Sequence, residues 1–198
     1  MKLFFTILFV SIFISIKAQP KPSSSEIKWA FFHPIAAVKA KKITAQCLKI
    51  VDSCAKYNCV DKFAYGGQLD AFRHGLWMAM LAQKMSTKKA IGLGKAHEKN
   101  NKKQFNKGIY PDNSIPDSAS ITMDLLNNVI AVKIGRQNKK LTTNQLTVLL
   151  IEEIKQGNFY CIKRNIKGNF VDVLGNEISI SEQKLNWNNK KYLVKSNQ

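Results

Sequence analysis

The sequence predicts a mainly α-helical fold, a helical bundle of about five helices with a small C-terminal β-meander. The bundle is predicted by two observations: apolar residues recur at helical spacing between residues 34 and 157, and capping residues stand near the ends of these stretches. The meander is predicted by a third observation, since after Gly157 the apolar residues form short β-rich runs separated by turn sequences. No internal repeat is present, and the length suits a single domain around one core.

The first 18 residues have the pattern of a secretory signal peptide. Lys2 precedes an apolar run over residues 3–16, and the small residue Ala18 can stand just before a cleavage site. This run is short for a membrane-spanning helix, and no stop-transfer sequence follows it. We therefore expect an exported protein, periplasmic or extracellular, whose mature chain starts near Gln19 and has no transmembrane segment.

A single domain is expected over residues 31–185, between a Pro/Ser-rich linker at 19–30 and a C-terminal tail at 186–198. Its five helices are predicted at residues 34–58, 69–85, 88–104, 121–138 and 144–157. The first begins with Pro34, and the N-caps of the last three are expected at Ser86 or Thr87, at Ser118 or Ser120, and at Thr142 or Thr143. Gly157 ends the last helix, and the runs FYCIKR, NFVDVL and EISI form the β-rich part from about residue 159.

The chain is strongly basic, with a formal net charge of +18 at pH 7, or +16 once Lys2 and Lys17 are removed with the signal peptide. This charge favours an acidic polymer or envelope component as partner, such as anionic lipid, glycan or nucleic acid. A solvated, lysine-rich surface is the alternative. Most of the charge is lysine spread along the chain, which argues against a dedicated face for specific nucleic-acid binding.

Four cysteines stand at positions 47, 54, 59 and 161. An even number of cysteines in an exported chain favours disulfides. We expect the pair Cys54–Cys59, because the helix that contains Cys54 is predicted to end near Asn58. There is no C-x-x-C pair in the sequence, which argues against a cysteine metal cluster.

Three polar residues, Asp70, Arg73 and His74, interrupt the most apolar predicted helix, within the segment GGQLDAFRHGLWMAMLAQ. A helix that is apolar nearly all round is usually buried. The three residues are spaced so that they share one side of the helix. Burying them costs several kcal/mol unless each one finds a partner, so we expect polar partners on neighbouring helices.

Two other predicted helices offer such partners. His97 and Glu98 lie in the third helix, and Asp124, Asn127 and Asn128 lie in the fourth. Neighbouring asparagines are poor helix formers, so their presence inside a helix favours a specific role. The sequence therefore predicts a polar cluster to which three helices contribute.

The motifs HPIAAVKA, DAFRHGLW, AHE and MDLLNN with a following IG resemble those of an uncharacterised bacterial domain family. Its members share H-P, D-A-F-R-H-x-x-W, H-E and M-D-x-x-N-N in this order, and the combination is specific although each motif alone is weak. The resemblance extends over roughly Phe32 to Ile180, including the β-rich part. This chain differs from many members by having Leu126 where a histidine often stands and Val132-Lys133 near a usual Gly-Arg.

This resemblance implies an α-helical domain of unknown function, found on exported proteins, and supplies no reaction. It also implies which residues matter: Asp70, Arg73, His74, Trp77, His97, Glu98, Asp124, Asn127 and Asn128.

Two functions fit the polar cluster. The first is a secreted hydrolase that acts on an acidic or envelope-associated substrate. His74, His97 and Asp124 then bind a metal such as zinc and leave one position open for water. Glu98 or Asp70 acts as general base, and Arg73 holds an anionic group such as a phosphate. The candidate catalytic residues are Asp70, Arg73, His74, His97, Glu98, Asp124 and Asn128.

The second function is a non-catalytic secreted binding or structural module. Asp70 and Arg73 then form a buried ion pair, and the histidines, Asp124 and the asparagines form a hydrogen-bonded network that only fixes helix packing. The sequence has no H-E-x-x-H motif that would indicate a metal by itself. The geometry separates the two functions. Convergence of His74, His97 and Asp124 within a few ångströms beside an open cleft favours the enzyme, whereas polar groups that are sealed from solvent and fully paired favour the structural module.

Overall fold

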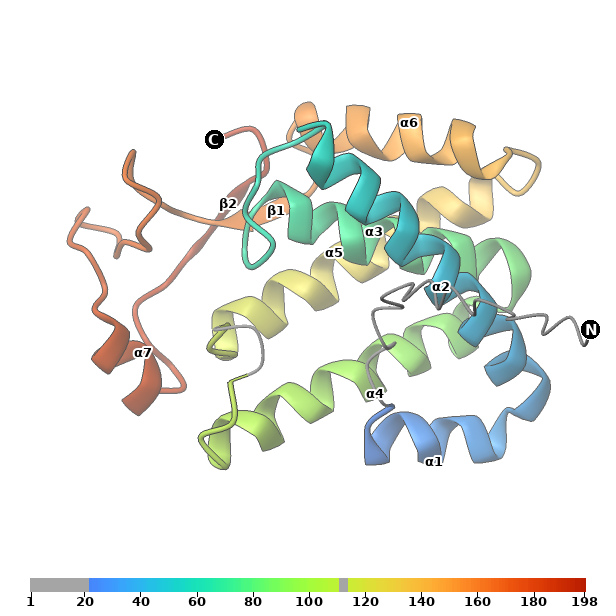
Figure 1. Cartoon of the computed structure of the whole chain (residues 1–198), viewed down its shortest axis with the longest axis horizontal. Coiled ribbons are helices and arrows are strands. Elements are labelled where there is room, and N and C mark those ends of the chain that lie inside the picture. Colours follow the sequence, from blue (N-terminus) through green and yellow to red (C-terminus); the bar gives the residue numbers. More distant parts are fainter. Residues whose placement is uncertain (1–21, 111–113) are drawn as a thin grey trace, which may run out of the picture.

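A computed structural model of the chain describes residues 22–110 and 114–198 (Figure 1). These residues form seven helices and a two-stranded antiparallel sheet near the C-terminus. The fold is therefore mainly α with a small β part, as the sequence predicts. The predicted signal peptide lies outside the described residues, and within them no helix combines the length and apolar character needed to span a bilayer.

The helices α2 to α6 correspond to the five predicted helices. The bounds of all seven are α1 (Ser24–Phe32), α2 (Pro34–Lys56), α3 (Gln68–Lys84), α4 (Thr87–Asn106), α5 (Ser118–Gln137), α6 (Thr143–Lys155) and α7 (Ile180–Leu185). Ser86 and Thr142 are the N-caps of α4 and α6, as expected. Helix α5 is capped by Asp117 instead, whose side chain accepts from the amide of Ser120 at 2.8 Å.

Helix α1 begins at Ser24, within the segment predicted as a linker, so the prediction of a linker was wrong for residues 24–30. The Ser23 hydroxyl accepts from the Glu26 amide at 3.2 Å, and the Glu26 carboxylate accepts from the Ser23 amide at 2.6 Å. This capping box satisfies two amides at the start of the helix, so the helix forms despite the serine-rich sequence. Helix α1 then packs against α4 and α2.

Helix α3 is the centre of the bundle. It packs against α2, α4, α5 and α6, and 12 of its 17 residues are buried, which explains its apolar character on nearly all sides. The backbones of α3 and α5 approach closely, because a Cβ atom at Gly135 would lie only 2.3 Å from the carbonyl oxygen of Ala79. The glycine of the IG motif therefore brings α5 close enough to share a polar cluster with α3.

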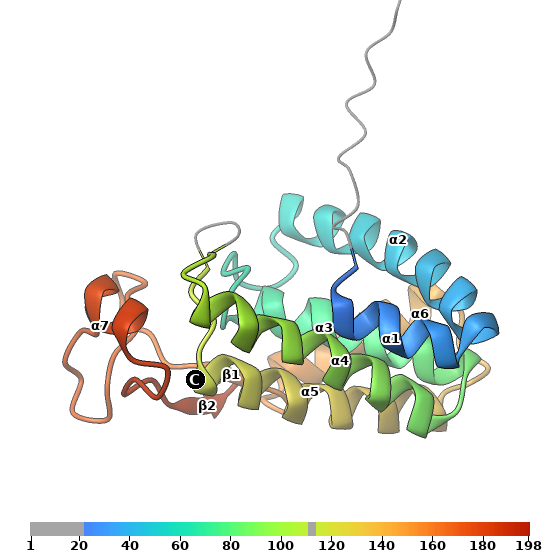
Figure 2. The ribbon, with the colours of Figure 1, turned by 90° about the horizontal axis from the view of Figure 1, so that it is seen from below.

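The C-terminal appendage extends from one end of the bundle (Figure 2) and differs from the predicted meander. Strand β1 (Tyr160–Ile162) pairs antiparallel with β2 (Leu193–Lys195), which lies in the segment predicted as a tail. The other two runs contribute only isolated bridges, Arg164–Phe170 and Val171–Glu177, and α7 begins in the last one. Gly168 and Gly175 have positive φ angles and turn the chain after a few residues, which leaves no length for a regular strand.

The appendage also holds the start of α5. The Lys191 ammonium donates to an Asp117 carboxylate oxygen at 2.6 Å, and both side chains are fully buried. The Asn189 amide donates to the same oxygen at 3.0 Å. Because Asp117 caps α5, these contacts fix the N-terminal end of the helix that contains Asp124.

The four cysteines are free thiols, so the expected Cys54–Cys59 disulfide is not present in this structure. Helix α2 ends at Lys56, and Asn58 has a φ angle of 51°, which turns the chain back on itself. The Cys59 amide then donates to the Cys54 carbonyl at 3.1 Å, so a backbone hydrogen bond closes this turn. Cys54 is buried in the core, and burial raises the pKa of its thiol to about 12, which keeps it protonated and unreactive.

Candidate metal centre

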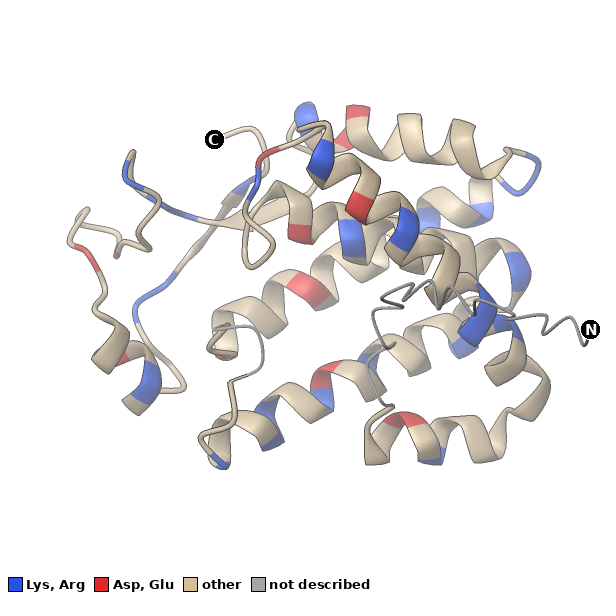
Figure 3. Cartoon of the chain, in the orientation of Figure 1, with Lys and Arg blue, Asp and Glu red and all other residues tan. Residues whose placement is uncertain are grey.

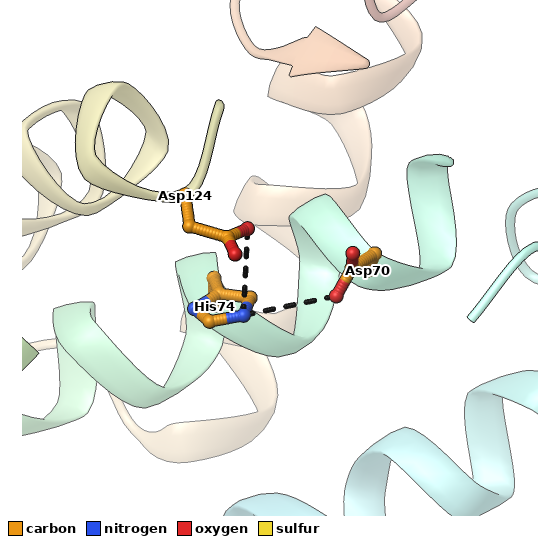
Figure 4. A group of neighbouring side chains, drawn as sticks. All are labelled: Asp70, His74 and Asp124. Atoms are coloured by element: carbon orange, nitrogen blue, oxygen red, sulfur yellow. Dashed lines mark ion pairs between the residues drawn. The ribbon is translucent and has the colours of Figure 1, made fainter. Parts of the chain in front are cut away.

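Helices α3 and α5 bring Asp70, His74 and Asp124 together (Figure 4). Asp70 and His74 lie one turn apart on α3, and Asp124 reaches them from α5. The Nε2 atom of His74 lies 3.4 Å from Asp124 Oδ1 and 3.7 Å from Asp70 Oδ1. One ligand atom from each residue lies within 4.8 Å of the other two, and all three side chains are buried.

These separations suit a small divalent cation. Zinc binds histidine nitrogen and carboxylate oxygen at about 2.0–2.2 Å, and tetrahedral angles then place two such ligand atoms about 3.4 Å apart. The measured nitrogen–oxygen distances of 3.4 Å and 3.7 Å are close to this value and longer than a usual hydrogen bond. One imidazole and two carboxylates are ligands that zinc accepts, and the carboxylates also suit manganese.

Several buried polar atoms in and around the cluster have no hydrogen-bond partner among the described residues. They are Asp124 Oδ1, His74 Nδ1, Glu98 Oε1 and both side-chain amide atoms of Asn128. Each unpaired buried group costs about 1–3 kcal/mol, so native structures rarely leave several of them in one place without a ligand or ordered water. These polar atoms of the cluster are therefore buried but not fully paired.

Glu98 on α4 is the fourth ionisable group of the cluster. Its Oε2 atom accepts from the Asn101 amide at 2.8 Å, and its Oε1 atom lies 4.0 Å from His74 Nδ1. Burial raises the pKa of Glu98 to about 7. A carboxyl group that titrates near neutral pH can accept and return a proton, which is what a general base must do.

Burial also determines the charges of His74 and Asp124. Burial lowers the pKa of His74 well below its usual value, with the positive charges of Arg73 and His97 adding to the effect, so the ring is neutral at pH 7. Burial raises the pKa of Asp124 well above its usual value, and the charges of Glu98 and Asp70 raise it further. A neutral imidazole is the form that binds a metal, and a bound cation would favour release of the carboxyl proton.

Arg73 forms the solvent-facing edge of the cluster. Its guanidinium donates to Asp70 Oδ1, and the second oxygen of Asp70 accepts from the Gly66 amide at 2.7 Å. The Arg73 side chain is 37% exposed, so this ion pair is open to water on the arginine side. Three carboxyl groups, those of Asp70, Glu98 and Asp124, therefore surround one guanidinium that can also reach a solvent-borne anion.

His97 does not join the three ligand atoms, in contrast to the predicted set of His74, His97 and Asp124. Its Nδ1 atom pairs with the carboxylate of Glu26 on α1 at 2.9 Å, and its side chain is 36% exposed. The centroid of its ring lies 6.0 Å from that of His74. Asp70, one turn before His74 on α3, takes the third ligand position instead, and His97 finds its partner on α1, in the segment predicted as linker.

The two asparagines of α5 have different environments. The Asn127 side chain donates to the Tyr160 carbonyl at 2.9 Å and accepts from the Tyr160 amide at 2.9 Å, so it joins α5 to β1. Asn128 faces α4, where a Cβ atom at Gly94 would lie 2.9 Å from its Nδ2 atom. Asn127 is thus structural. Asn128 interacts with His74 through its side chain, but neither of its amide atoms has a hydrogen bond of good geometry among the described residues.

Trp77 and Leu126 have other environments. The Trp77 indole donates to the Thr44 hydroxyl at 3.0 Å and packs edge-on against His97, so it links α3 to α2 and α4. Leu126, where many members of the resembling family have histidine, is an exposed residue of α5, unlike the buried Asp124 two positions before it.

The Glu26–His97 pair predicts a pH-dependent contribution to stability. Burial raises the pKa of Glu26, but hydrogen bonds from His97 and Ser23 outweigh it and lower that pKa to about 2. Burial lowers the pKa of His97, but the bond to Glu26 outweighs it and raises that pKa above the usual 6.5. The pair therefore stabilises the fold most between pH 4.5 and 6.5, and the contribution is lost as the pH rises through the raised pKa of His97 or falls toward 2.

We expect Glu26→Gln to lower the free energy of unfolding by at most about 1 kcal/mol near pH 5.5, because both side chains are partly exposed. The loss should be smaller at pH 9. Urea unfolding at the two pH values measures it, with Glu152→Gln on the exposed face of α6 as the control. An equal loss at both pH values would contradict the role of the charged pair.

A comparison with protein-family models matches residues 27–158 to Domain of unknown function (DUF6973). The match begins within α1 and ends before β1, so it includes the whole polar cluster and excludes the β-rich appendage that the sequence resemblance included. No curated protein and no solved structure matches the chain. Because the family model matches more than half of its residues, the chain belongs to the DUF6973 family of domains of unknown function.

Proposed function

We propose that this protein is an exported, metal-dependent hydrolase that acts on an acidic, envelope-associated substrate. The proposal depends on one observation above all: ligand atoms of Asp70, His74 and Asp124 lie within 4.8 Å of one another. Of these, Asp124 Oδ1 is buried and has no partner among the described residues. A set of three protein ligands that leaves a fourth position for water is typical of catalytic zinc sites.

The residues around the three ligands have complementary chemistry. A bound zinc ion lowers the pKa of a coordinated water molecule toward neutral. Glu98 is the general base, because its free Oε1 atom is buried next to the cluster and its pKa is about 7. Asn128 offers an unpaired amide donor for a developing negative charge, and Arg73 binds an anionic group of the substrate from the solvent-facing edge.

Charge and the N-terminal sequence support the location and the substrate class. The signal-peptide pattern of the first 18 residues favours export, and the net charge of +16 that remains once Lys2 and Lys17 are removed attracts polyanions. Figure 3 shows lysine and arginine positions on most helices and on the appendage, and acidic positions on α3, α4 and α5 as well as on α1, α2, α6 and the appendage. A basic surface around an acidic cluster suits a protein that attracts an anionic polymer and binds a cation.

Metal analysis of the purified protein tests this function. After incubation with zinc and removal of free ions, we expect about one zinc ion per chain in the wild type and none in His74→Ala, since a ligand nitrogen is lost. His97→Gln is the matched control and should keep its zinc, because His97 pairs with Glu26. A wild type that binds neither zinc nor manganese would overturn the proposal, and circular dichroism confirms that each variant is folded.

The non-catalytic module remains the second candidate, favoured by the complete burial of the three ligands and by the structural role of Asn127. It predicts that the protein retains no zinc after incubation and that zinc leaves its melting temperature unchanged. Metal analysis and a thermal melt with zinc therefore separate the two functions.

A further inference from the structure

An apolar corner projects from the bundle where α1 meets α2. Phe31, Phe32 and Ile35 are 78%, 65% and 76% exposed, and Pro34 between them is exposed as well. Ile27 lies one turn before Phe31 on α1, and one turn beyond Ile35 on α2 lies a further exposed apolar residue, Val38. The exposed residues 31–35 follow one another along the chain with only His33 half-buried, so they form one continuous patch.

The geometry of this corner is well defined. His33 ends α1 with φ −139° and ψ 55°, and Pro34, which lacks an amide hydrogen, starts α2 directly after it. The His33 ring stacks on Trp29 with 5.0 Å between centroids, so it turns inward. Phe31 and Phe32 turn outward and pack edge to face, 5.3 Å apart. Two adjacent aromatic side chains held in solvent indicate an interaction surface.

The sequence around the corner is basic. Residues 27–51 contain five lysines and no aspartate or glutamate. On α2, exposed residues recur at helical spacing as Ile35, Val38, Lys39 and Lys42, so one face is apolar at its start and basic beyond it. Figure 3 shows several basic positions along α2. An apolar tip bordered by lysines is the arrangement that binds the interface of an anionic bilayer.

We propose that this corner docks on an anionic lipid surface. Phe31, Phe32 and Ile35 enter the headgroup region, and the neighbouring lysines, Lys28, Lys39 and Lys42, contact lipid phosphates. A second copy of the chain fits less well, because pairing two such corners would bring the lysines of both copies together. The proposal is independent of the metal cluster and would place the protein at the envelope whatever reaction it catalyses.

Co-sedimentation with vesicles tests the role of the apolar residues. The wild type should bind vesicles of phosphatidylglycerol and phosphatidylcholine at least about tenfold more tightly than vesicles of phosphatidylcholine alone. Phe31→Ser/Phe32→Ser should weaken this binding at least about tenfold. The matched control is Val173→Ser/Leu174→Ser, which removes another adjacent exposed apolar pair, from the appendage, and should bind like the wild type. All proteins are compared in the same processed form, verified by mass spectrometry.

The lysines are tested in the same assay. Lys39→Gln/Lys42→Gln should weaken binding and reduce its salt dependence, whereas Lys139→Gln/Lys140→Gln, in the turn between α5 and α6, should do so far less. The proposal is overturned if Phe31→Ser/Phe32→Ser binds like the wild type, since charge alone would then explain adsorption. It is also overturned if the wild type ignores vesicles and forms a dimer that this variant abolishes.

Discussion

Asp124→Asn is expected to stabilise the metal-free protein by about 1–3 kcal/mol at pH 7. Burial, together with the charges of Glu98 and Asp70, raises the pKa of Asp124 well above its usual value. Its Oδ1 atom also has no hydrogen-bond partner among the described residues. An ionised carboxylate in this position opposes folding, and an amide of the same shape removes the charge. Urea unfolding in the presence of a chelator measures the gain.

This gain has a defined pH dependence. Because folding raises the pKa of Asp124, the penalty is complete above the folded pKa and fades as the pH falls toward 3.8, the usual value for aspartate. The difference in stability between Asp124→Asn and the wild type should therefore shrink in acid. Asp52→Asn, on the exposed face of α2, should change little at any pH and serves as the control.

With zinc present, the wild type should become more stable than Asp124→Asn. A ligand that binds only the folded state stabilises it by about 2.7 kcal/mol at a hundredfold excess over its dissociation constant. Asp124→Asn lacks one of the three ligands and should lose most of this effect. If the variant were less stable than the wild type in chelator, the cluster would be a satisfied structural network and not a cation site.

Arg73→Met is expected to abolish the thermal protection that sulfate gives to the zinc-loaded protein. Without metal, the guanidinium of Arg73 is already paired with the Asp70 carboxylate, which opposes the binding of an anion. A zinc ion adds two positive charges, and the exposed guanidinium of Arg73 can then bind a sulfate. Sulfate should therefore raise the melting temperature of the zinc-loaded wild type by about 2–4 °C for each kcal/mol of binding. It should not raise that of the metal-free protein or of Arg73→Met.

The same substitution also affects stability without any ligand, because it removes the cation that pairs with Asp70. The Arg73 side chain is 37% exposed, so the loss should be about 1–2 kcal/mol, less than for a fully buried pair. Asp70→Asn/Arg73→Met should recover much of it. Arg136→Met, an exposed position near the end of α5, controls for general salt effects of sulfate. A large loss of stability that sulfate does not modify would show that Arg73 is purely structural.

The sequence by itself determined the helices α2 to α6 and most members of the cluster. Apolar spacing, Pro34, and the caps Ser86 and Thr142 are local signals, and local hydrogen bonds place helix ends where such signals stand. The apolar character of α3 on all sides predicted its burial. Since Asp70 and His74 are four residues apart, the helical repeat alone places them side by side. The capping box of Ser23 and Glu26 that starts α1 is also a local signal, with a serine three residues before a glutamate.

Only the tertiary structure decided which polar groups meet. His97 pairs with Glu26, 71 residues away, and Asn127 pairs with the backbone of Tyr160, which leaves Asp70 as the third ligand. Strand β2 pairs with β1 across the appendage, and the helix turn leaves Cys54 and Cys59 unlinked. These outcomes depend on how each helix is rotated about its axis and how closely its neighbours approach, as at Gly135. Such quantities follow from packing of the whole core, which no local spacing along the chain encodes.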